Sequence, residues 1–125
     1  MFGAIEPIEI EFAAAMSASE ARQKAVSVLR ERAGRIKIDK DEIVVAGFGS
    51  SWKARLFGTV LAGVQSMPRE VKVELQQGES QTIVSVLVRD TFGFGSRFGV
   101  ADKLRQLMRD DAFALKRALS PPEHG

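Results

Sequence analysis

The chain has 125 residues, of which 45% are hydrophobic and 27% are charged, and its formal net charge is +2. These values are typical of one soluble domain with a single core, and the charge excess is too small to indicate nucleic-acid binding by itself. Cysteine and tyrosine are absent, and the one histidine, His124, lies beside the C-terminus. This composition argues against disulfides, thiolate or zinc sites and histidine-based catalysis, so we expect no catalytic residue, metal or cofactor.

The N-terminal third changes from a strand pattern to a helix pattern. Residues 8–12 alternate apolar and acidic side chains, which predicts a half-buried strand. Residues 17–20 read Ser-Ala-Ser-Glu, a capping box that predicts the start of a helix. An alanine-rich stripe continues this helix to about Ala33, and Gly34 is a natural C-terminal stop.

The middle of the chain has the short alternating runs of an antiparallel meander. Turns are expected at residues 39–42 and at residues 77–80, the second of which reads Gln-Gly-Glu-Ser and indicates a hairpin. The expected strands are residues 35–38, 43–46, 52–57, 71–76 and 83–88.

The C-terminal region predicts one long amphipathic helix. Apolar residues recur at helical spacing between Arg97 and Leu119, and a proline-containing tail follows. We therefore predict a single α+β domain over residues 1–119 and a flexible tail over residues 120–125. An antiparallel meander of about five to six strands is packed by both helices, in the order β-α-β-β-β-β-β-α.

One phrase occurs twice in the sequence. Residues 47–52 read Gly-Phe-Gly-Ser-Ser-Trp, and residues 93–98 read Gly-Phe-Gly-Ser-Arg-Phe. Each copy closes an apolar run, where glycines mark chain reversals or close backbone approach. The second copy could also hold an anion at a helix N-terminus, but neither copy is a Walker or dinucleotide loop. We favour two turns with packed aromatic side chains.

Residues 57–64 form the longest apolar stretch and offer no polar face to water. Such a segment is either buried in the domain, used in a dimer contact, or placed as a lid over an apolar ligand. It is too short to span a bilayer, and the first residues lack the features of a signal peptide. A cytoplasmic protein without a membrane span is the resulting expectation.

The order of elements over residues 5–119 resembles a shortened START-like (SRPBCC) helix-grip domain, in which a long C-terminal helix lies against a curved antiparallel sheet. This resemblance rests on element order and implies a pocket between the sheet and that helix. Gly49-Ser50, Arg55 and Gly58 also resemble a pattern found in small bacterial proteins, which implies no activity.

The leading functional hypothesis is a non-catalytic module that binds an apolar or amphipathic small molecule between the sheet and the C-terminal helix. Its expected wall consists of Trp52, Leu56, Phe57, Leu61, Phe94, Phe98, Leu104 and Met108. The alternative is an assembly subunit, a homo-oligomer or a partner of another protein. It would use the apolar segment and Phe113, which falls opposite the apolar stripe of its helix.

A second alternative is a nucleic-acid-associated protein with a basic face. That face would contain Lys53, Arg55, Arg69, Lys72, Arg89 and Arg97. We favour a solvated outer sheet face whose charges pair with neighbouring acids, because exposed strand faces are ordinarily charged. Nucleic acid is therefore the less favoured partner, and the sequence does not favour an enzyme.

Overall fold

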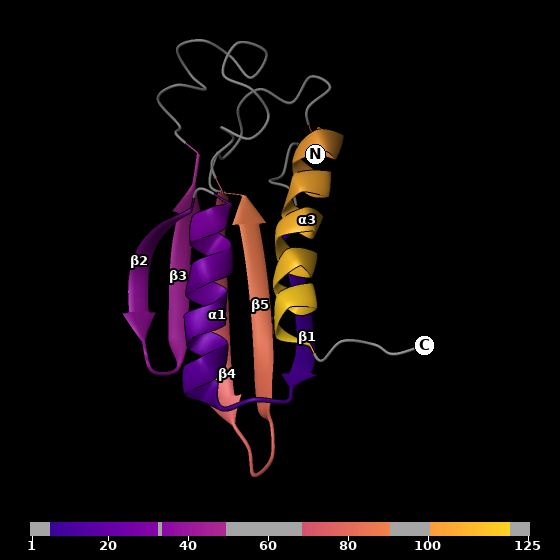
Figure 1. The fold of residues 1–125 in the computed structure, drawn as a ribbon. Helices are drawn as coiled ribbons and strands as arrows, with labels where there is room; N and C mark the ends of the chain where they lie inside the picture. The colour runs from indigo at the N-terminus through magenta and orange to yellow at the C-terminus, as the bar shows by residue number, and fades with distance from the viewer. Residues whose placement is uncertain (1–5, 33, 50–68, 91–100, 121–125) are drawn as a thin grey trace.

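A computed structural model of the chain shows a five-stranded antiparallel sheet with two helices on one of its faces (Figure 1). The structure describes residues 6–32, 34–49, 69–90 and 101–120. The elements are β1 (Ile8–Ala14), α1 (Ala18–Glu31), β2 (Arg35–Lys40), β3 (Ile43–Phe48), β4 (Arg69–Gln77), β5 (Thr82–Asp90) and α3 (Ala101–Leu119). The predicted α+β class and the packing of the sheet by an N-terminal and a C-terminal helix are confirmed.

The sheet has the strand order β1-β5-β4-β3-β2, and every neighbouring pair is antiparallel. The first strand therefore lies beside the last, and β3 lies between β2 and β4. Helix α1 packs over β2, β3 and β4, while α3 packs mainly over β1 and β5 (Figure 1). The helices also contact each other, so they form one layer over a single face of the sheet.

The capping box explains where α1 begins. The Oγ of Ser17 accepts a hydrogen bond from the backbone N–H of Glu20 at 3.2 Å, which satisfies one of the free donors at the helix start. The helix ends at Glu31, and the N–H of Gly34 donates to the carbonyl of Leu29 at 2.8 Å. Both ends thus lie close to the predicted positions.

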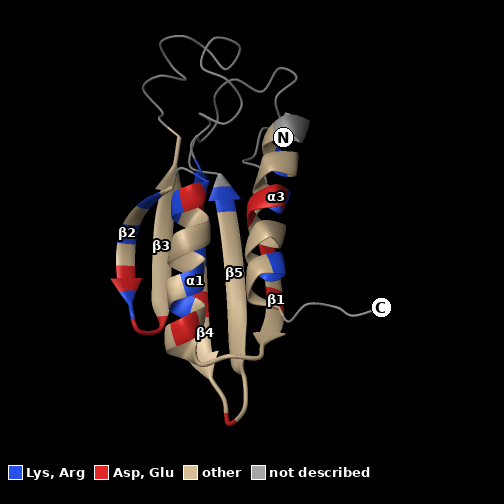
Figure 2. Cartoon of the chain, viewed as in Figure 1, with Lys and Arg blue, Asp and Glu red and all other residues tan. Residues whose placement is uncertain are grey.

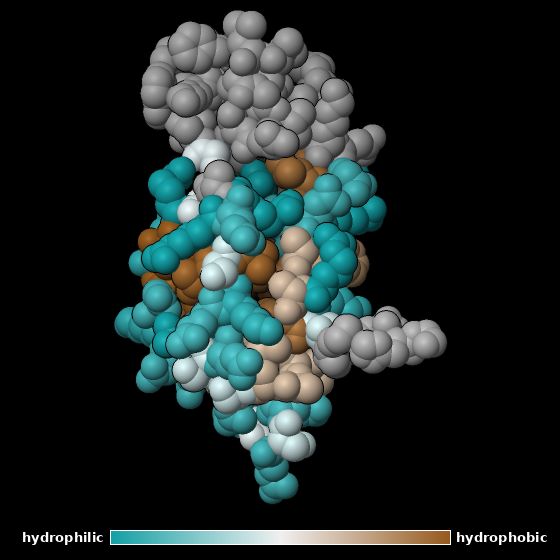
Figure 3. Space-filling view, in the orientation of Figure 1, coloured by the Kyte–Doolittle hydropathy of each residue, from teal (hydrophilic) through white to brown (hydrophobic). Residues whose placement is uncertain are grey.

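The core follows from strand alternation and from the stripe on α3. Alternate side chains of β4 and β5 point toward the helices. They contact the apolar face of α3, whose buried side chains recur every three or four residues along the helix. The buried side chains of this layer include Val71, Val73, Leu75, Val84, Val86, Val88, Leu104, Met108 and Leu115. On the outside, hydrophilic side chains cover most of the helical face, and hydrophobic ones show between α1 and the strands beside it (Figure 3).

Strand β3 runs further than predicted. The turn before it lies at Asp41 and Glu42, and the strand continues through Gly47 to Phe48. Gly47 and Phe48, the first two residues of the first copy of the phrase, are therefore strand and not turn, because Gly47 pairs with Glu70 and the Phe48 side chain is buried. The reversal begins at Gly49, whose φ of 75° is in the left-handed region that favours glycine.

The two ends of the sheet carry different kinds of connection. At the lower end in Figure 1, tight turns join β2 to β3 and β4 to β5, where the N–H of Gly78 donates to the carbonyl of Gln81 at 2.7 Å. The predicted hairpin is thus confirmed. At the upper end, β3 ends at Phe48, β4 begins at Arg69 and β5 ends at Asp90. The predicted strand 52–57, the apolar segment 57–64 and the second copy of the phrase lie outside the described residues.

Candidate functional site

Two connections that leave the sheet at its upper end contain most of the residues of the predicted ligand wall. Residues 50–68 connect β3 to β4, and residues 91–100 connect β5 to α3, so both connections start and finish at this end. Six of the eight predicted wall residues belong to these two connections and lie outside the described residues: Trp52, Leu56, Phe57, Leu61, Phe94 and Phe98.

The other two predicted wall residues lie in the first half of α3. Leu104 and Met108 are fully buried and belong to the core cluster. The first turns of α3 rise beyond the end of β5 in Figure 1, so this half of the helix lies at the upper end.

A buried ion cluster lies on the same face of α3, immediately after Met108. Asp111 is completely buried, and one of its carboxylate oxygens, Oδ2, accepts from the Nε of Arg69, which is itself 3% exposed. The other oxygen, Oδ1, accepts from the Nε of Arg32 at 3.0 Å and lies 2.9 Å from its Nη2. Asp111 therefore ties α3 to the end of α1 and to the start of β4.

An aromatic ring completes the surroundings of Arg69. Its guanidinium carbon lies 4.5 Å from the centroid of the Phe48 ring, a cation–π geometry. The edge of this ring is close to Gly34, where a Cβ atom would lie 2.7 Å from the Cζ of Phe48 and 2.9 Å from the carbonyl oxygen of Leu29. The absence of a side chain at Gly34 thus allows the ring to lie where it meets Arg69.

This cluster was missed at the level of sequence, although both of its buried charges carried a signal. Asp111 falls within the apolar stripe of Leu104, Met108 and Leu115, at spacings of three and four residues. Arg69 is separated by even numbers of positions from the buried residues Val71, Val73 and Leu75, so its side chain lies on the same face of the strand as theirs. A charge in an apolar stripe requires a buried partner, so an acid and a base at such positions are natural candidates to meet.

The basic face expected for nucleic acid is divided in the part of the chain that the structure describes. Arg69 points into the core, whereas Lys72 and Arg89 lie on the open face of the sheet. Inclusion of Arg69 in that face is therefore wrong, because positions 69 and 72 fall on opposite sides of a strand. Lys53, Arg55 and Arg97 lie outside the described residues.

The open face of the sheet carries paired charges centred on Glu70. Arg89 donates to the Glu70 carboxylate at 2.7 Å and 2.9 Å, and the Nζ of Lys37 lies 3.4 Å from it. Burial raises the pKa of Glu70, but the hydrogen bonds and charges of Arg89 and Lys37 outweigh this effect and hold the pKa below its ordinary value. Lys72 lies 3.8 Å from Glu74, one of the acids expected to pair on this face.

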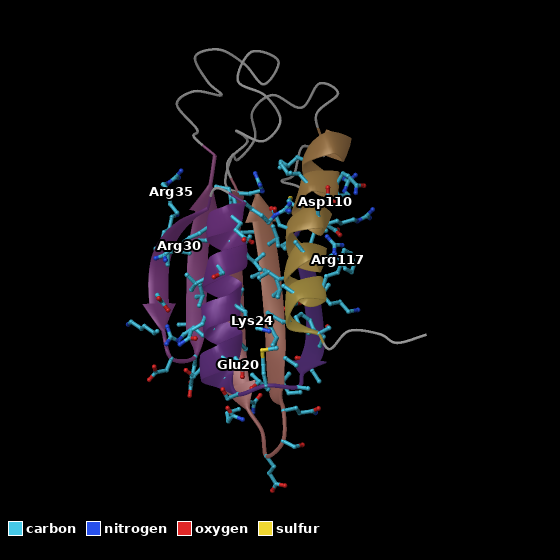
Figure 4. All side chains as sticks on the ribbon, viewed as in Figure 1. Glu20, Lys24, Arg30, Arg35, Asp110 and Arg117 are labelled. Carbon is cyan, nitrogen blue, oxygen red and sulfur yellow. The ribbon has the colours of Figure 1, made fainter. Side chains whose placement is uncertain are left out.

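Charges of both signs occur at both ends of the described structure. The red of acidic residues marks the turn after β2 and the tip of the β4–β5 hairpin, and blue marks the upper parts of β2 and β5 (Figure 2). Figure 4 likewise places Arg35 near the upper end of the sheet and Glu20 near the lower end of α1.

Together, the antiparallel sheet and the two helices on one of its faces define an α+β protein whose fold is similar to the helix-grip fold. Among solved structures, the chain is similar to DynU16, a protein of the dynemicin biosynthetic locus, with a TM-score of 0.50 and 10% sequence identity. The match covers 89% of this chain and 46% of DynU16, so this chain spans less than half the length of that neighbour. At this identity the likeness shows the fold alone.

No family model and no curated protein matches the sequence. Within the described ranges, no helix is long and apolar enough to cross a membrane. Across those same residues, no three acidic or histidine side chains come together in a way that could hold a metal ion.

Proposed function

We propose that this protein is a non-catalytic binding module that holds an apolar or amphipathic small molecule between the sheet and α3, at the upper end. The observation that supports the proposal is the connectivity of the segments that contain the predicted wall. Leu104 and Met108 lie in the first half of α3, and the other six wall residues belong to the two connections that join the sheet at that end.

The helix-grip likeness supports this placement, because ligand sites favour positions where a scaffold of regular elements presents variable connections. The ion cluster adds a second reason. A polar group fixed beside an apolar wall can orient an amphipathic molecule, which an entirely apolar core cannot do.

The test is binding of a neutral apolar probe, Nile red, followed by its fluorescence. We expect saturable binding near one molecule per chain, and loss of binding in Leu61→Asp and Phe98→Asp while far-UV circular dichroism is unchanged. Phe113→Asp is the matched control, because Phe113 is 40% exposed on α3 and lies outside the proposed wall. Absence of Nile red binding to the native chain would contradict the proposal.

An assembly subunit is the second candidate, supported by the exposure of Phe113. Its ring lies 6.0 Å from the Nζ of Lys116, so an aromatic and a cation are presented together on the outer side of α3. If this surface joins two chains, Phe113→Asp should lower the mass measured by light scattering. In a ligand-binding monomer the same substitution should leave that mass unchanged.

A further inference from the structure

Strand β1 forms one edge of the sheet, and within the described residues it pairs with β5 alone (Figure 1). The pairing is regular over the whole of Ile8–Ala14, with no shift of register. The opposite edge, β2, is interrupted by a bulge between Ile36 and Ile38. A bulge protects an edge against pairing with another chain, whereas a regular edge presents a continuous row of backbone N–H and C=O groups. Of the two edges, β1 is therefore the one to which a further strand can be added.

Apolar side chains on the helix side of β1 are incompletely covered at this edge. Ile8, Ile10 and Phe12 pack against the core cluster, yet each of them remains partly exposed. Their partners on β5 lie in the same layer and are completely buried: Val88, Val86 and Val84. The difference arises because no described strand lies beyond β1. Apolar side chains of an added strand would cover this flank as cross-strand neighbours.

The other side of β1 carries acidic side chains. Glu9 and Glu11 are exposed on the open face of the sheet, opposite Leu87 and Ser85 of β5. The Oγ of Ser85 donates to Glu11 at 3.3 Å. In the part of the chain that the structure describes, neither glutamate forms an ion pair with a lysine or an arginine.

The basic residues of the described elements are directed elsewhere. Arg89 of β5 lies on the open face, but it is bound to Glu70 at 2.7 Å, and Lys72 of β4 lies beside Glu74. The basic residues of β2 are at the far edge of the sheet, and those of α3 are on its helix side. A cation placed beside β1 on the open face would therefore meet two carboxylates that have no competing ion pair.

We propose that the outer edge of β1 binds an extended segment of another protein in which basic and apolar residues alternate. In this type of strand addition, backbone hydrogen bonds supply affinity and alternate side chains supply specificity. The basic side chains lie on the open face beside Glu9 and Glu11. The apolar side chains lie on the helix side, where they cover the exposed flank of Ile8, Ile10 and Phe12. This surface is separate from the ligand site proposed above.

A second copy of this chain is a poor occupant of the same edge. When two β1 strands pair antiparallel with their open faces aligned, a centred register brings Glu9 opposite Glu11, or Glu11 opposite itself. Like charges directly opposite each other destabilise a sheet. The chain's own run of alternating basic and apolar residues, residues 35–38, contains the bulge of β2. These features favour a different chain as the partner.

The test uses three labelled synthetic peptides and measures binding by fluorescence anisotropy. One alternates lysine and valine, one alternates glutamate and valine, and the third is the lysine peptide with every backbone amide methylated. The native chain should bind the lysine peptide about tenfold or more tightly than the glutamate peptide, because two cross-strand charge pairs change from attractive to repulsive. The methylated peptide should not bind, because it keeps the charge but cannot donate to the backbone ladder.

Variants assign the preference to β1. Glu9→Lys combined with Glu11→Lys should bind the glutamate peptide more tightly than the lysine peptide. The matched control is Glu42→Lys combined with Glu79→Lys, which changes the net charge equally at two exposed residues away from β1 and should keep the native preference. Hydrogen exchange should show that the lysine peptide newly protects alternate backbone amides of β1 and none of β2.

Four results would overturn the inference. They are no binding of the lysine peptide, equal binding of the two charged peptides, a native preference that persists in Glu9→Lys with Glu11→Lys, and binding of the methylated peptide. A dimer seen by light scattering that this double variant dissociates would also overturn it, because a second copy would then occupy the edge. None of these measurements uses Nile red, so the inference and the proposed function fail independently.

Discussion

Replacement of Asp111 by alanine is the sharpest test of how the helices are held to the sheet. The substitution removes the carboxylate that faces Arg69, which is 3% exposed, and Arg32. Loss of one partner from a buried ion pair leaves an uncompensated charge and typically costs about 3–5 kcal/mol. Since a domain of this size unfolds with about 5–15 kcal/mol, Asp111→Ala should lower the melting temperature by roughly 10–20 °C.

The measurements are thermal unfolding and urea unfolding, both followed by far-UV circular dichroism, with Asp110→Ala as the control. Asp110 is the neighbouring acid, but it is exposed and accepts a hydrogen bond from Gln106 at the helix surface, so its loss should change stability by about 0.5 kcal/mol or less. Equal effects of the two substitutions would refute the buried cluster.

A double variant guards against an Asp111→Ala protein that does not fold. Arg69→Met with Asp111→Leu removes both charges and keeps apolar volume, so it should recover much of the stability lost in Asp111→Ala. The interaction energy from the full cycle should be at least about 1 kcal/mol. Additive effects of the two substitutions would show that the residues do not depend on each other.

Three further predictions concern packing and pH. Gly34→Ala should lower the melting temperature because its Cβ would meet the Phe48 ring and a backbone carbonyl, whereas at Gly47 the added atom meets only the flexible end of Lys37; equal losses in the two variants would contradict this reasoning. Leu115→Ala should cost about 2–5 kcal/mol in urea unfolding, and a cost of a few tenths would mean that α3 is peripheral. Because the pKa of Glu70 is lowered in the folded protein, its contribution is present above its ordinary pKa and lost as the pH falls through the folded value. The stability difference between the native chain and Glu70→Gln should therefore be largest near pH 7 and shrink as the pH is lowered below the ordinary pKa of 4.5, and a difference independent of pH would show that the charge is not responsible.

Periodicity predicted much of the fold because β1, β4, β5 and both helices show the pattern of their burial in their own sequences. The alternation in β4 and β5 and the stripe on α3 needed no knowledge of the rest of the chain. Element ends were less well predicted. Gly47 was read as a turn residue, but it lies in β3, where pairing with Glu70 outweighs the low strand propensity of glycine.

The candidate site was predicted less completely, for a different physical reason. Arg69 lies on the buried face of its strand and Asp111 lies within the apolar stripe of its helix. Both are patterns within a single element, and together they could have indicated a buried pair. The part played by Arg32 is not local, because it depends on how the end of α1 approaches the middle of α3. That approach is set by the packing of two helices on one sheet, which no pattern within a single element contains.

The position of β1 affects how the chain can fold during synthesis. Its sheet partner is β5, so that residues such as Glu11 and Ser85, 74 positions apart, must come together before the strand is paired. The hairpins β2–β3 and β4–β5 close locally and can form much earlier. Until β5 leaves the ribosome, the backbone edge of β1 has no strand to pair with. The acidic residues Glu9 and Glu11 on β1 are well placed to discourage aggregation of the nascent chain during that time.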